Sequence, residues 1–177
     1  MIKNQIYITK QLQSRLSLDR RYDLDRKLRA VIKLFPELDA ERIEVGLTTA
    51  TFTHAAAKTN LEDRIKIVYN PLYPITYFTL GHELTHFVQH LDEEETGIKI
   101  PYGEVQCDVW TLARDELFLD AQPFYLRLPK RICDDWRRYS KQVRELCIKA
   151  IEVRKTKRQY LRWLERELLK LAPLVKR

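Results

Sequence analysis

The five residues from His82 to His86 are His-Glu-Leu-Thr-His, and they constrain this chain more than any other stretch. On an α-helix, positions four apart lie about 40° apart around the axis and about 6 Å apart along it, so the two imidazoles project from one face. Zinc binds imidazole nitrogen at about 2.0 to 2.1 Å, and a catalytic zinc has three protein ligands and one open position. The spacing therefore predicts a helix over residues 76–91 that supplies two metal ligands, His82 and His86.

Glu83 lies about 100° around the same helix from His82. That is too far round to share the metal, but near enough to reach a water bound to it, so we predict that Glu83 is the general base. The residues around the motif are uncharged apart from Glu83, which predicts that the helix is buried. The alternative is a buried helix whose two histidines are hydrogen-bonded core residues.

The chain has four histidines, so few residues can supply a third nitrogen ligand. His90 lies on the same helical face one turn further along, where it cannot comfortably share one ion with the pair, and we interpret it as a polar residue near the helix end. His54 lies in an alternating segment and is interpreted as a strand-surface or cleft-wall residue. The third ligand is therefore predicted to be a carboxylate, and a second cluster carries two of them in the sequence Glu104-Val-Gln-Cys-Asp108.

The two clusters together resemble the gluzincin metallopeptidases, especially the soluble minigluzincins, whose second motif is Glu-x-x-x-Asp. The resemblance implies a zincin-like fold, zinc as the cofactor, and hydrolysis of peptide bonds in a peptide or protein substrate. It also implies that Glu104 is the third zinc ligand and that Asp108 orients a zinc-binding histidine. A carboxylate behind an imidazole fixes the tautomer of the ring, which supports that role. The alternative for Asp108 is an exposed helical carboxylate.

The fold class that we predict is α+β, with a zincin-like core. This core has a small, mostly antiparallel β-sheet, the metal helix and a helix from Glu104 to about Leu119, and it is joined by N-terminal helices and a long C-terminal helical extension. Alternation of polar and apolar residues predicts a half-buried strand over residues 63–71, directly before the metal helix. Two further strands are predicted over residues 42–48 and 50–58, and two N-terminal helices over residues 5–17 and 24–35.

Charge divides the chain into two parts. We predict a metallopeptidase domain with N-terminal helices in residues 1–126 and a basic helical extension in residues 127–177. The extension has 17 Lys and Arg against 6 Asp and Glu, a net charge of +11, whereas the whole chain has +7. Apolar residues recur at three- and four-residue spacing over residues 136–153 and 161–171, which predicts one long helix or two in series. The apolar stripe needs a partner: the core, the other half of the extension, or another chain through oligomerisation.

Two other functional classes remain as alternatives. The basic extension, above all residues 154–158, can attract phosphate, so a nucleic-acid-binding module is one of them, although no helix-turn-helix or similar motif is present. The other is a zinc protein without proteolytic activity. Glu83 argues against it, because a structural zinc site has no use for a general base.

The remaining features concern compartment and catalysis. Three cysteines without a Cys-x-x-Cys spacing predict reduced thiols, and the chain has neither an apolar run long enough to span a membrane nor an apolar N-terminal signal. We therefore expect a cytoplasmic protein. Tyr102 and Arg114 are the nearest candidates in sequence to stabilise an oxyanion, but each fits a structural role better.

Overall fold

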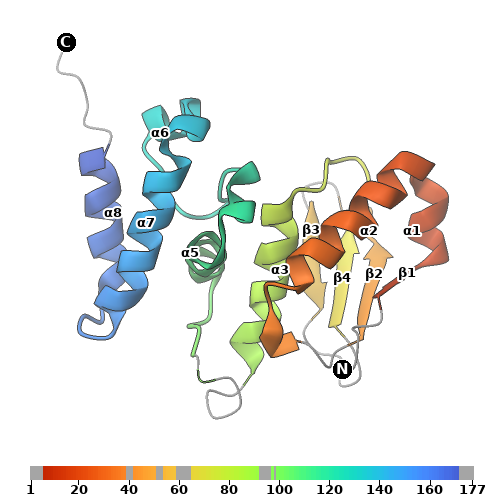
Figure 1. Cartoon of the computed structure of the whole chain (residues 1–177), viewed down its shortest axis with the longest axis horizontal. Coiled ribbons are helices and arrows are strands. Elements are labelled where there is room, and N and C mark those ends of the chain that lie inside the picture. Colours follow the sequence, from red (N-terminus) through yellow and green to blue (C-terminus); the bar gives the residue numbers. More distant parts are fainter. Residues whose placement is uncertain are drawn as a thin grey trace.

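The computed structural model describes residues 6–38, 42–50, 54–58, 65–91, 97 and 99–171. These residues form an α+β fold with seven α-helices and a four-stranded mixed sheet. The sheet lies at one end of the molecule and the C-terminal helices lie at the other, with the helix that begins at Glu104 between them (Figure 1). Within the described residues, no helix is both long enough and apolar enough to cross a membrane.

The sheet has four strands, in the spatial order β1 (Ile6–Ile8), β2 (Ile43–Leu47), β4 (Ile65–Tyr69) and β3 (Ala55–Lys58). The first two neighbouring pairs are parallel, and only β3 runs antiparallel, along β4. The prediction of a mostly antiparallel sheet is therefore wrong. The reason is that α1 (Lys10–Arg15) and α2 (Leu18–Ile32) connect β1 to β2, and a helical crossover returns the chain to the same end of the sheet.

The strand predicted directly before the metal helix is confirmed as β4, and β2 lies within the second predicted strand. The third is shorter than predicted, because β3 begins at Ala55, and residues 51–53 of that prediction lie outside the described residues. The prediction of a helix over residues 5–17 is wrong at its N-terminal end, where the chain forms strand β1 before α1. Tyr7 is 54% exposed between the half-buried Ile6 and Ile8, and this alternation belongs to strand β1.

The predicted metal helix is α3 (Tyr77–His90). The hydroxyl of Thr76 accepts the backbone N–H of Thr79 at 3.0 Å. The carboxylate of Asp120 accepts the first two N–H groups of the helix at 2.7 and 3.0 Å, where a negative charge also suits the helix dipole. The start of α3 is thus fixed both by its own cap and by a residue more than forty positions away.

The helix that carries the second cluster is α5 (Glu104–Arg114). It ends earlier than predicted, because Asp115 is extended and its carboxylate accepts the N–H of Leu117 at 2.8 Å, which starts the 3-10 helix η2 (Glu116–Asp120). Before α5, Gly103 has a φ of +117°, a value that suits glycine and places the chain at the N-terminus of the helix.

The predicted extension contains α6 (Lys130–Asp134), α7 (Trp136–Arg154) and α8 (Tyr160–Leu171). Of the two predicted alternatives, one long helix or two in series, the structure has two, with the break at residues 155–159. The apolar stripe packs within the same chain, because α7 lies against α5 and α8 lies against α7. The indole N–H of Trp136 donates to the carbonyl of Leu119 at 2.9 Å, across the proposed division at residue 126, which itself stays a prediction.

Candidate metal centre

The two histidines of α3 meet the first turn of α5. His82 Nε2 lies 3.0 Å from Glu104 Oε2, and His86 Nε2 lies 3.2 Å from the same oxygen. Tetrahedral ligands held at about 2.0 to 2.1 Å from one zinc ion are about 3.3 to 3.4 Å apart. The separations from Glu104 Oε2 to the two nitrogens are therefore close to those that a shared zinc ion requires.

The other nitrogen of His82 faces Asp108, one turn along α5 from Glu104. Asp108 is fully buried, and its Oδ1 lies 2.9 Å from His82 Nδ1. Its Oδ2 accepts the backbone N–H groups of Tyr125 and Leu126 at 2.5 and 2.7 Å. The carboxylate is thus held from both sides, and the proton of His82 belongs on Nδ1, which leaves Nε2 to bind a metal. The alternative of an exposed carboxylate at position 108 is wrong.

His86 is oriented by a residue that the sequence interpretation missed, Gln89. Its side-chain amide nitrogen donates to the carbonyls of Pro101 and Gly103 at 2.6 and 3.3 Å. The amide oxygen is then left to accept from His86 Nδ1, 3.1 Å away. The available signal was the position of Gln89, three residues after His86 and so on the same helical face.

The donor atoms at this centre require a positive charge between them. When the Nδ1 atoms of His82 and His86 are protonated, their Nε2 atoms and the Glu104 oxygen are all hydrogen-bond acceptors. Acceptors this close repel one another, so a cation or a proton must lie between them. Burial lowers the pKa of His82, but hydrogen bonds to Asp108 and Glu104 outweigh it and raise the pKa to about 9. The hydrogen bond from His82 in turn lowers the pKa of Glu104.

Glu83 is 5% exposed beside the two histidines. Burial raises the pKa of its carboxyl to about 7, although the charge of His82 and a hydrogen bond from the backbone of Ala57 in β3 act in the opposite direction. The negative charge of Glu104 adds to the rise. A carboxyl with a pKa near neutrality can both take up and release a proton at physiological pH, which is the requirement for a general base.

These side chains open into a cleft of about 550 Å³. The edge strand β3 forms part of one wall, and His54, directly before it, stacks on Tyr73 with ring centroids 4.0 Å apart. The cleft-wall interpretation of His54 is therefore confirmed. Phe124 and Tyr125 also line the cleft, and the Tyr125 ring lies 5.7 Å from that of His82. Nothing in the sequence marked these two residues, because their loop follows no periodic pattern.

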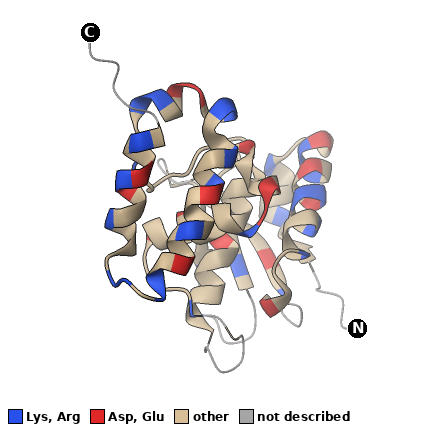
Figure 2. Ribbon diagram, turned by 60° about the vertical axis from the view of Figure 1, so that its left-hand side comes forward, with Lys and Arg blue, Asp and Glu red and all other residues tan. Residues whose placement is uncertain are grey.

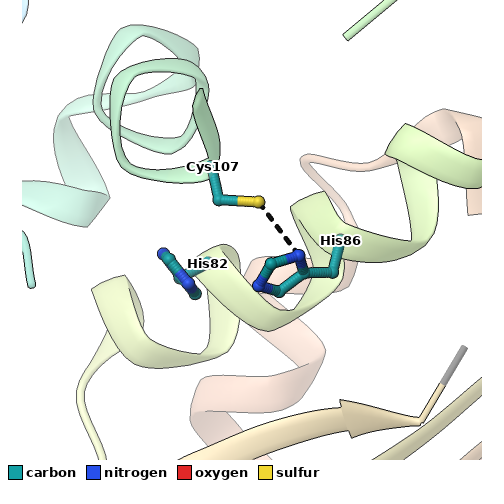
Figure 3. A group of neighbouring side chains, drawn as sticks. All are labelled: His82, His86 and Cys107. Carbon is teal, nitrogen blue, oxygen red and sulfur yellow. Dashed lines mark hydrogen bonds between the residues drawn. The ribbon is translucent and has the colours of Figure 1, made fainter. Parts of the chain in front are cut away.

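Cys107 offers a second way to complete the centre. The ligand atoms of His82, His86 and Cys107 all lie within 4.8 Å of one another, so these three residues could hold a metal ion (Figure 3). However, Cys107 Sγ lies 3.2 Å from His86 Nδ1, the nitrogen that also faces Gln89, and not beside Nε2. Burial also raises the pKa of the thiol above its usual range. The two ligand sets share both histidines and differ in the third residue.

The two oxyanion candidates from the sequence lie elsewhere. Arg114 forms a two-bond ion pair with Glu37, at 2.8 and 3.1 Å, and its guanidinium lies over the ring of Phe35. Tyr102 is 60% exposed and contacts His90, with ring centroids 5.2 Å apart. Neither is among the residues that line the cleft.

Comparison with known proteins finds no matching family model, no matching curated protein and no matching solved structure.

Proposed function

We propose that this chain is a zinc-dependent metallopeptidase of the gluzincin type, with a zincin-like core. The observation that carries the proposal is the approach of His82 Nε2 and His86 Nε2 to one oxygen of Glu104, beside the buried Glu83. Two imidazoles and one carboxylate are a ligand set that catalytic zinc uses. In this proposal Asp108 and Gln89 orient the two imidazoles. A bound zinc ion supplies a Lewis acid and lowers the pKa of a coordinated water.

Glu83 moves the proton in the proposed reaction. Its carboxylate accepts a proton from the attacking water and then donates it to the leaving amine as the peptide bond breaks. Burial raises the pKa of this carboxyl above that of an exposed glutamate, which favours its uptake of a proton. The hydrogen bond from the Ala57 backbone holds the carboxylate at the wall of the cleft, next to the strand that would bind the substrate.

The proposed substrate is a peptide or an unfolded segment of a protein. β3 pairs with β4 along one edge, and Ala55, Ala56 and Ala57 line the cleft. A strand at the edge of a sheet can bind an extended peptide through backbone hydrogen bonds, and alanine side chains leave room for it. The peptide would then run past Glu83 and the two histidines.

A second candidate function is a metal site without catalysis, in which Cys107 takes the place of Glu104. The proximity of the three ligand atoms of His82, His86 and Cys107 favours it. This candidate requires a thiolate, because the thiolate is the form of cysteine that binds metal, and the buried Cys107 thiol would have to lose its proton to the incoming ion.

Zinc content and peptide cleavage distinguish the two candidates. We expect the wild-type protein to contain one zinc ion per chain by elemental analysis, Glu104→Ala to lose it, and Cys107→Ala to keep it. Glu83→Gln should keep zinc and lower the rate of cleavage of a peptide library by about 10² to 10⁴. Loss of zinc in Cys107→Ala with full zinc in Glu104→Ala would establish the second candidate. A zinc-loaded wild type that cleaves no member of the library would overturn the peptidase.

A further inference from the structure

A second concave surface lies on the C-terminal helices, and it shares no residue with the metal cleft. It has a volume of about 700 Å³ and is formed by the turn between α7 and α8 and by one side of α8. We call it the α8 groove, and its lining residues are Lys157, Arg158, Gln159, Arg162, Trp163, Glu165 and Arg166. Four of these seven side chains are cationic and one is a carboxylate.

The cations of the α8 groove are exposed and face solvent without an anionic partner. Over the part of the chain that the structure describes, no ion pair joins any of the four to a carboxylate. Two lysines just outside the groove differ, since Lys155 pairs with Glu152 and Lys170 pairs with Glu167, each at 2.7 Å. Within the described residues, the groove therefore carries four cations against the single carboxylate of Glu165. Lys and Arg recur along these helices and the turn between them (Figure 2).

This arrangement contributes little to the stability of the fold. Arg162 and Arg166 lie one helical turn apart on α8, and like charges at this spacing destabilise a helix by a few tenths of a kcal/mol, which Glu165, three residues after Arg162, offsets by at most a similar amount. Arg162 has one long hydrogen bond, to Gln159 Oε1 at 3.4 Å. A row of guanidinium groups that repel one another is better explained by an anionic partner than by folding.

The aromatic side chain in the groove narrows the choice of partner. Trp163 is half-buried on α8 and lines the groove between Arg162 and Arg166. Aromatic rings that stack on bases, set among cations that bind phosphates, are the combination with which proteins bind single-stranded nucleic acid. An Arg guanidinium also binds phosphate through two parallel hydrogen bonds, which Lys does not do.

A membrane surface fits these observations less well. A helix that lies on a bilayer inserts its apolar face among the lipids. The apolar face of α8 is already used, because Tyr160, Leu164 and Leu168 are buried and α8 packs on α7.

We propose that the α8 groove binds single-stranded nucleic acid, with Arg158, Arg162 and Arg166 on the phosphates and Trp163 stacked on a base. The inference does not depend on the metal centre. It adds a binding function to the proposed peptidase, and each can fail without the other.

The test is fluorescence anisotropy of a labelled 20-nucleotide oligo-dT titrated with the full chain over a series of salt concentrations. The triple variant Arg158→Ala, Arg162→Ala, Arg166→Ala should weaken binding at least about tenfold. It should also reduce the slope of log affinity against log salt by about 2, because each phosphate that an arginine neutralises adds about 0.7 to that slope. The matched control removes the same charge from exposed positions on α1 and α2, as Lys10→Ala, Arg15→Ala, Arg29→Ala. It should change affinity less than about twofold, since net charge alone has a small effect at high salt.

A second pair of variants tests the stacking. Trp163→Phe keeps a ring and should bind oligo-dT within about threefold of wild type, whereas Trp163→Leu should lose about tenfold. Thermal denaturation verifies that each variant is folded. Equal weakening by the control triple variant overturns the proposal. So does tighter binding to a 20-base-pair duplex or to phosphatidylserine vesicles than to oligo-dT.

Discussion

Helices α3 and α8 use polar residues in opposite ways. Eleven of the fourteen residues of α3 are buried, among them His82 and Glu83, whereas three of the twelve residues of α8 are buried and all three are apolar or aromatic. On α3 the ionisable groups contact one another and residues of β3 and α5. On α8 the guanidinium groups face solvent.

The difference implies that the two helices tolerate change differently. Because His82, Glu83 and Asp108 are buried and hydrogen-bonded, a substitution at these positions alters both stability and chemistry. Charges on α8 are screened by water, so a substitution there alters interactions with partners and leaves the fold almost unchanged. Four predictions compare the metal centre, which α3 forms with α5, with the exposed helix α8. Each is measured as a change in the free energy of unfolding by denaturant titration.

The largest effect is expected at Asp108, the residue of α5 that holds His82 in place. Asp108→Ala removes the acceptor of His82 Nδ1 and of the backbone N–H groups of Tyr125 and Leu126, and its hydrogen bonds to His82 and Leu126 are buried. Loss of a buried, fully bonded carboxylate of this kind costs about 3 to 5 kcal/mol. Denaturant titration of the metal-free protein measures this loss.

Asp108→Asn separates stability from metal binding. Its amide oxygen can still accept the N–H groups of Tyr125 and Leu126, so we expect a smaller loss of stability than in Asp108→Ala. Its amide nitrogen would face His82 and favour the wrong tautomer, so zinc affinity should fall about 10- to 100-fold. Unchanged zinc affinity in Asp108→Asn would contradict the role assigned to this residue.

The second effect is a gain of stability at Glu83. Its pKa is about 7 in the folded chain, against an ordinary value of 4.5, so the folded state disfavours the ionised carboxylate. The contribution of Glu83 to the free energy of unfolding is fully present below pH 4.5. It is lost as the pH rises through 7, and the loss totals about 3 kcal/mol. In the presence of a chelator, Glu83→Gln should therefore be more stable than wild type at pH 8 and equally stable near pH 4. A less stable variant at pH 8 would show that burial of the charge has no cost.

The third effect concerns the close approach of α3 to its neighbours. A Cβ added at Gly81 would lie 2.5 Å from the ring of Phe118 and 2.9 Å from the methyl of Thr111. Overpacking usually costs about 1 to 3 kcal/mol, and contacts this short lie at the upper end of that range. Alanine favours the helix by about 1 kcal/mol, so Gly81→Ala should lose about 2 kcal/mol in all. Gly46→Ala is the control, because its nearest neighbour would be 3.5 Å away. An equal change in the free energy of unfolding in Gly81→Ala and Gly46→Ala would contradict the packing argument.

The sequence could predict the parts of the molecule that follow from local patterns, but not those that depend on distant contacts. The metal helix, the strand before it and the two C-terminal helices follow from local periodicity, and His82, Glu83 and His86 from one short motif. Gln89 was within reach of the same helical reasoning. The parallel pairing of β1 with β2 was not, because it depends on a crossover of helices and on distant residues. The contacts of Tyr125 and Leu126 with Asp108 join residues 17 and 18 positions apart through a loop with no pattern.

The smallest effect is expected on α8. Arg162→Glu replaces a repulsion with Arg166 by an attraction at a spacing of four residues, but it also replaces the attraction to Glu165, three residues on, by a repulsion of similar size. The two effects offset each other, so the free energy of unfolding should change by less than about 0.5 kcal/mol. The same variant should bind oligo-dT at least about tenfold more weakly, since it removes one cation from the phosphates and adds a repelling charge. A variant with nearly unchanged stability and weaker binding of oligo-dT would show that Arg162 serves binding and not folding. Loss of stability in Arg162→Glu would instead show that this arginine stabilises α8, and the contrast with α3 would no longer hold.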